Sequence, residues 1–81
     1  MDKNEVETQW RKLFAKQLRV VMAEQDIKGS ELAEMTGIPN SLIYQYRRGE
    51  VTPKTFNLVK ICRVLNVDAN KLLGIRRDDA K

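Results

Sequence analysis

Apolar side chains recur along the chain at intervals of three and four residues, which is the spacing of one face of an α-helix. The pattern predicts a long first helix from Asn4 to about Gln25. Its apolar stripe consists of Val6, Trp10, Leu13, Phe14, Leu18, Val21 and Met22. Runs that alternate apolar and polar residues, as strands do, are absent from the sequence. We therefore predict an all-α fold.

Residues 29–49 (GSELAEMTGIPNSLIYQYRRG) predict two short helices joined by a tight turn. Gly37 is expected to end the first of them, because glycine readily adopts the left-handed conformation of a C-terminal stop. Pro39 fits the first turn of the next helix, where its missing N–H costs nothing. Gly49 is expected to end that second helix. We expect the first of these helices to begin between Lys28 and Ser30, and by residue type Ser30 is the better N-cap.

The remaining residues predict two more helices. Thr52 and Pro53 suit the N-cap and first position of a helix that runs to about Leu65. Its inner side is expected to carry Phe56, Leu58, Ile61, Cys62 and Leu65. Asp68 is expected to cap a short fifth helix, residues 69–73, which Gly74 ends.

The domain organisation follows from these elements. We expect one domain, residues 1–75, that forms a compact five-helix bundle with a central helix-turn-helix. Residues 76–81 have little to bury, and we expect them to form a flexible charged tail.

Composition and charge narrow the possible functions. The 81 residues carry 15 Lys and Arg against 11 Asp and Glu, and the net charge of +4 permits nucleic-acid binding without requiring it. The sequence contains no histidine and only one cysteine, Cys62, which excludes an intrachain disulfide and a Cys/His zinc site. We expect no metal and no cofactor, and a lone cysteine fits a reducing cytoplasm.

Two further classes of protein, membrane proteins and enzymes, find no support in the sequence. No apolar run approaches the roughly 18 residues of a membrane span, so we expect no membrane partner. Without histidine, a serine or cysteine nucleophile lacks its usual base, and no glycine-rich phosphate loop is present. We therefore expect neither catalytic residues nor a small-molecule substrate.

The second helix of the central pair has a polar and cationic outer face, formed by Asn40, Ser41, Tyr44, Gln45, Arg47 and Arg48. Asn and Gln side chains can form paired hydrogen bonds with adenine in the DNA major groove, and Ser can contact several bases. Arginine and lysine suit phosphate contacts. The alternative is a polar face that contacts only solvent and has no role in binding.

Residues 31–74 resemble the lambda-repressor-like helix-turn-helix domains of the Xre, or Cro/cI, type. The matching features are ELAE with Gly37-Ile38, then Ile43 and Gly49, then Pro53, Leu58, Ile61 and Leu65, and finally VD followed by LLG. None of these features is specific to the family by itself, but their order and spacing along the chain are.

The resemblance implies a five-helix bundle whose third helix enters the major groove of double-stranded DNA. It places Asn40, Ser41 and Gln45 at base-edge contacts, with Tyr44 on the same face. It implies phosphate contacts at Gly29, Ser30, Arg48, Thr52 and Lys54, and Arg47 is a further candidate by its charge.

The sequence departs from the family pattern at four positions. Many members carry Ser or Thr where this chain has Lys28 and Pro39. Many also pair an arginine in the first helix with a glutamate near the end of the third, at the positions of Met22 and Arg47. Losing one partner of a buried pair costs about 3–5 kcal/mol, whereas replacing both can be neutral. We therefore expect Met22 to pack in the core and Arg47 to reach solvent or phosphate.

The resemblance implies a sequence-specific transcriptional regulator, expected to be a repressor. One recognition helix reads few base pairs, so we expect a homodimer on a pseudo-palindromic operator with half-sites ~34 Å apart. Residues 67–75 are the expected dimer surface. The alternative is a protein-interaction adaptor or antitoxin-like module on the same fold, which should expose apolar or acidic residues on the third helix. A stand-alone regulator and a fragment of a longer one both fit the chain.

Overall fold

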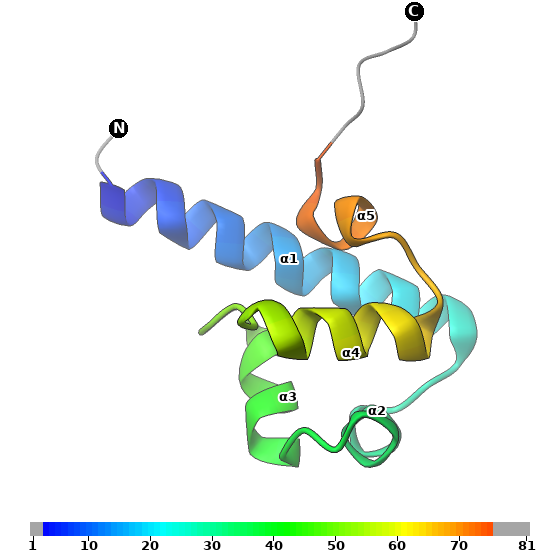
Figure 1. Cartoon of the computed structure of the whole chain (residues 1–81). Coiled ribbons are helices and arrows are strands. Elements are labelled where there is room, and N and C mark those ends of the chain that lie inside the picture. The colour runs from blue at the N-terminus through cyan, green and yellow to red at the C-terminus, as the bar shows by residue number, and fades with distance from the viewer. Residues whose placement is uncertain (1–2, 76–81) are drawn as a thin grey trace, which may run out of the picture.

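A computed structural model describes residues 3–75, which form five helices (Figure 1). They are α1 (Lys3–Gln25), α2 (Gly29–Thr36), α3 (Asn40–Arg48), α4 (Thr55–Leu65) and α5 (Ala69–Leu73). No strand occurs within this range. The all-α fold with a central helix-turn-helix is thereby confirmed. The expected tail, residues 76–81, lies outside the described residues.

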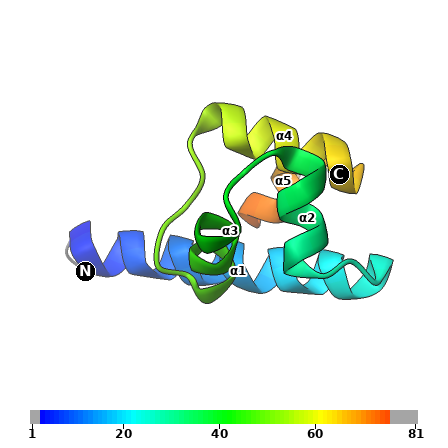
Figure 2. The same ribbon diagram turned by 90° about the horizontal axis from the view of Figure 1, so that it is seen from below.

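The long helix α1 is the support on which the others are arranged. It contacts α3, α4 and α5, while α2 packs against α3 and α4. The N-terminal end of α1 extends beyond the rest of the bundle (Figures 1 and 2). Helix α3 packs against α1 and α2, and α4 contacts α1 directly. Helix α3 is therefore held by its contacts with the long helix α1 and with α2.

One continuous hydrophobic core joins all five helices. Its buried members are Phe14, Leu18, Val21, Met22, Leu32, Ala33, Ile38, Ile43, Tyr46, Ile61, Leu65 and Leu72. The ring of Phe14 meets that of Tyr46 edge-on, with centroids 6.4 Å apart. The Tyr46 hydroxyl accepts a hydrogen bond from the Asn57 side chain at 3.0 Å, so the buried phenol is also satisfied. These contacts fix α3 to α1 and link it to α4.

The predicted helix ends are largely confirmed. Gly37 and Gly49 follow α2 and α3 with φ of 76° and 78°, in the left-handed region that glycine enters without strain. The Asp68 carboxylate accepts the Asn70 N–H at 2.8 Å and so caps α5. The turn between α2 and α3 is short and comprises residues 37–39, because Gly37, which ends α2, is closely followed by the N-cap of α3.

Helix α2 begins within the expected range from Lys28 to Ser30, but the preference for Ser30 as its cap and the place of Pro39 in the first turn of α3 are wrong. Ser30 lies inside α2, and the N-cap is Lys28, whose backbone N–H donates to the Glu31 carboxylate at 2.8 Å. Pro39 is the N-cap of α3 rather than part of its first turn, and its carbonyl accepts N–H groups from Leu42 and Ile43. Neither helix has the side-chain cap that serine or threonine would give: in α2 the Glu31 carboxylate accepts the N-cap N–H, and in α3 the Pro39 carbonyl accepts the first backbone hydrogen bonds.

The predicted start of α4 is also wrong. Thr52 and Pro53 belong to the preceding loop, and α4 begins at Thr55 with Lys54 as its N-cap. The Lys54 carbonyl accepts the Leu58 N–H at 2.9 Å. Delaying the helix lets Val51 turn back and pack against the core. Burial of that side chain outweighs the local preference for a Thr-Pro helix start.

Two aromatic residues expected in the core lie outside it. Phe56 is 82% exposed and Trp10 is 53% exposed. With 3.6 residues per turn, Phe56 points roughly 140° away from the buried Ile61, which lies five positions later. Trp10 lies on the half of α1 that extends past the other helices, so no element covers it.

Candidate nucleic-acid interface

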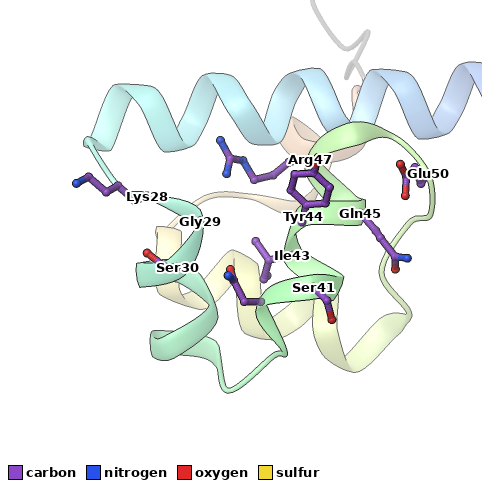
Figure 3. Close-up of a pocket in the computed structure, with 10 residues that line it drawn as sticks. Lys28, Gly29, Ser30, Ser41, Ile43, Tyr44, Gln45, Arg47 and Glu50 are labelled. Atoms are coloured by element: carbon purple, nitrogen blue, oxygen red, sulfur yellow. The ribbon is translucent and has the colours of Figure 1, made fainter.

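A groove between the start of α2 and the outer face of α3 brings most of the candidate residues together (Figure 3). Its lining residues are Lys28, Gly29, Ser30, Asn40, Ser41, Ile43, Tyr44, Gln45, Arg47 and Glu50. Every candidate for base contact lines it, as do Gly29, Ser30 and Arg47. Arg48, Thr52 and Lys54 lie outside the groove. Sequence reasoning missed Lys28 and Glu50 as lining residues.

Helix α3 divides sharply between a buried and an exposed side. Ile43 and Tyr46 are buried, whereas the side of Asn40, Tyr44 and Gln45 is exposed. The exposed groups are amides and hydroxyls, which can both donate and accept hydrogen bonds. Because the buried side fixes the rotation of the helix, the polar side has a defined orientation toward the groove (Figure 3).

The C-terminal end of α3 is bound to α1. The Arg19 guanidinium of α1 donates to the backbone carbonyl of Arg47 at 2.6 Å. Carbonyl groups in the last turn of a helix have no partner within the helix, and a cation there also complements the helix dipole. Arg19 therefore fixes the C-terminal end of α3 to α1, a contact that no local sequence signal predicts.

Arg48 is held by neighbours on the protein surface. It donates to the Tyr44 hydroxyl at 2.8 Å, lies 5.3 Å from the Tyr44 ring centroid and pairs with Glu50 at 3.1 Å. The hydrogen bond to Tyr44, and secondarily the Glu50 carboxylate, raise the pKa of Arg48. A surface ion pair contributes only about 0–1 kcal/mol, so Arg48 can exchange Glu50 for a phosphate at little cost.

Arg47 lies at the junction of α3 with the start of α2. Its side chain is half-buried, and its Nε is buried without a hydrogen-bond partner. An added Cβ at Gly29 would lie only 2.6 Å from its Nη1, so the missing side chain of Gly29 makes room for the guanidinium. Within residues 3–75 it has no carboxylate partner.

The expectations for Met22 and Arg47, which stand at the ion-pair positions of many family members, therefore have different outcomes. Met22 packs in the core at 3% exposure, as predicted. The expectation that Arg47 reaches solvent holds only in part: the side chain is half-buried and lines the groove, but its Nε is buried. Contact between Arg47 and a phosphate stays a prediction.

A comparison with protein families bears directly on this site. Residues 17–78 match the family model of the Cro/C1-type HTH DNA-binding domain, which is well over half of the chain. The chain belongs to this family. The match confirms the resemblance to the lambda-repressor-like domains and makes the groove part of a DNA-binding domain. A search of curated proteins found no significant match.

The start of α2 lines the groove beside α3. Gly29 is buried and Ser30 is exposed at the groove. The first N–H groups of a helix lack partners within the helix and favour anions such as phosphate. Glu31 occupies the Lys28 N–H, which leaves the next backbone donors as the candidates for an anion.

The loop before α4 forms a separate depression. Thr52 and Lys54 line it together with Leu42, Val51 and Asn57. Both Thr52 and Lys54 are exposed, so they remain available to a ligand although they lie outside the main groove.

Other kinds of site find no counterpart in the described part of the chain. No cluster of three potential metal ligands occurs in residues 3–75. No helix there is long and apolar enough to span a membrane.

Proposed function

We propose that this Cro/C1-type domain is a sequence-specific transcriptional repressor that acts in the cytoplasm without a cofactor. It places α3 in the major groove of an operator and blocks transcription by occupying that DNA. The observation that carries the proposal is the exposed row of Asn40, Ser41, Tyr44 and Gln45 beside the start of α2. Amide and hydroxyl groups on a rigidly held helix are the chemistry of base recognition.

In this proposal the side chains divide into two roles. Asn40, Ser41, Tyr44 and Gln45 contact base edges, and Asn40 and Gln45 are suited to adenine. The phosphate contacts are Gly29, Ser30, Arg47, Arg48, Thr52 and Lys54. Phosphate contacts set affinity, register and salt dependence, whereas base contacts set sequence preference.

We propose further that two copies bind a pseudo-palindrome, because one α3 reads too few base pairs for useful specificity. The segment from Val67 to Ile75 is the proposed dimer surface. Ile75 is 50% exposed, and Val67 and Leu73 are only partly buried. This end of the molecule therefore retains apolar surface that a second copy can cover.

The alternative, an adaptor or antitoxin-like module, has less support. Such a module would present apolar or acidic side chains on the exposed side of α3. The exposed residues of α3 in this chain are polar or basic, apart from the aromatic ring of Tyr44.

Selection of bound duplexes from a random DNA pool, repeated at two salt concentrations, tests the proposal. We expect enrichment of one motif at both concentrations, with two inverted copies of a half-site. Weak, salt-sensitive binding that enriches no motif would contradict a sequence-specific regulator and favour the adaptor.

A further inference from the structure

Three cations lie in a stripe on α1. Lys12, Lys16 and Arg19 are all exposed and follow one another at intervals of four and three residues, which places them on one side of the helix. Within residues 3–75 none of the three forms an ion pair. The groove described above does not include them.

The stripe borders the end of the recognition helix. Gly49, which ends α3, lies against the Lys12 backbone and the Ala15 side chain: a Cβ added to Gly49 would be 3.5 Å from each. Arg19 reaches the carbonyl of Arg47 in the last turn of α3. In Figure 3, α1 runs along one edge of the groove. Lys12 and Arg19 are thus close to the C-terminal end of α3.

A different side of α1 carries the contacts with α5. Leu13 packs against Gly74, and Glu24 pairs with Lys71 at 3.6 Å. Because Lys12, Lys16 and Arg19 are turned away from that side, α5 does not cover them. The stripe therefore remains open to a ligand when the bundle is complete.

We propose that Lys12, Lys16 and Arg19 bind the phosphate backbone of the DNA that flanks the major groove occupied by α3. This inference rests on the proposed function and adds a second contact surface to it. At a rise of 1.5 Å per residue, the stripe spans roughly 6 Å from Lys12 to Lys16 and roughly 10 Å from Lys12 to Arg19. One DNA strand carries a charge about every 3.4 Å along the duplex axis, so the stripe is long enough to reach several phosphates of one strand.

The stripe gives the domain a contact that increases affinity without reading sequence. Phosphate contacts position the protein, and each releases condensed counterions. Removing these cations should therefore weaken binding to every site alike and leave the preferred bases unchanged.

A matched pair of double variants tests the stripe. Lys12→Gln/Lys16→Gln removes two of its charges and spares Arg19, which also holds the end of α3. Lys60→Gln/Arg63→Gln removes the same charge from exposed positions on α4, a helix that does not line the groove. Both pairs lower the net charge equally, so a difference between them reports location rather than charge.

The readout is the salt dependence of binding, measured by fluorescence anisotropy on a labelled duplex that carries the selected motif. We expect Lys12→Gln/Lys16→Gln to reduce the slope of log K against log salt by about 1.8, at about 0.9 per phosphate contact, and Lys60→Gln/Arg63→Gln to leave it close to wild type. Equal slopes for the two double variants would overturn the inference. Failure of the wild-type protein to bind DNA at all would instead overturn the proposed function.

Shortening the duplex on each flank gives a second, independent measurement. Removing the flank that the stripe contacts should lower wild-type affinity and barely affect Lys12→Gln/Lys16→Gln. If shortening either flank weakens both proteins by the same factor, the stripe does not contact flanking DNA.

Discussion

Arg47 offers the sharpest test of how this chain replaced the ion pair common in its family. The guanidinium lies half-buried over Gly29, and its buried Nε lacks a hydrogen-bond partner. Arg47→Met keeps an unbranched, flexible side chain that can fill the same space, and removes the unpaired nitrogen. The substitution therefore separates the effect of Arg47 on fold stability from its proposed contact with a phosphate.

The expected gain in stability follows from the unpaired group. A buried polar group without a partner costs about 1–3 kcal/mol, and methionine loses part of the packing that the guanidinium supplies. We expect the free energy of unfolding to rise by about 1 kcal/mol, which raises Tm by about 4–8 °C in a domain of this size. Urea and thermal unfolding followed by circular dichroism measure both quantities.

Arg48→Met is the matched control. Arg48 is exposed and makes only surface contacts, so its loss should change stability by no more than about 0.5 kcal/mol. If Arg47 and Arg48 both contact phosphate, each substitution should lower the salt slope of DNA binding by about 0.9. A loss of more than about 1 kcal/mol in stability for Arg47→Met would refute the reasoning, because it would show that the buried guanidinium is stabilising.

The remaining predictions concern base reading, the core and the single thiol. Gln45→Ala should relax preference at one base position by about 1–3 kcal/mol, whereas Lys54→Ala should weaken all sites alike; a repeat of the selection distinguishes these outcomes. Phe56→Ala should change unfolding free energy by less than about 0.5 kcal/mol, whereas Ile61→Ala should lower it by about 2–5 kcal/mol; equal losses in urea unfolding would place Phe56 in the core. Burial, and secondarily Asp68, raise the pKa of the Cys62 thiol, so alkylation should be slower in the folded protein than in urea at mildly alkaline pH. Equal rates would show an unperturbed thiol.

Helix positions were predictable because their signals are local. Gly37 and Gly49 end helices through a backbone conformation that glycine adopts freely, and Asp68 caps α5 with its own carboxylate. The polar side of α3 was indicated by its residue types, and in the structure it lies opposite the buried Ile43 and Tyr46. These features depend on neighbours within about one turn of helix, which a sequence displays directly.

The errors arise where the outcome depends on distant parts of the chain. The apolar stripe of α1 includes Trp10, but periodicity alone does not show that no helix covers that end. Val51 draws the loop into the core and delays α4 past Thr52 and Pro53. The position of Arg47 depends on an empty space at Gly29, in another helix. Each of these features depends on contacts between helices, which the periodicity of the sequence does not show.

The central claim is that α3 reads base edges in the major groove, and a base-analogue experiment tests it most directly. In the selected motif, replacing adenine by 7-deazaadenine removes a major-groove acceptor and leaves the minor groove and the phosphates unchanged. We predict a loss of about 1–3 kcal/mol in binding free energy at adenines read by Asn40 or Gln45, and no loss from 3-deazaadenine, which lacks the minor-groove acceptor. Full affinity for every 7-deaza duplex, with losses only from 3-deazaadenine, would contradict the account.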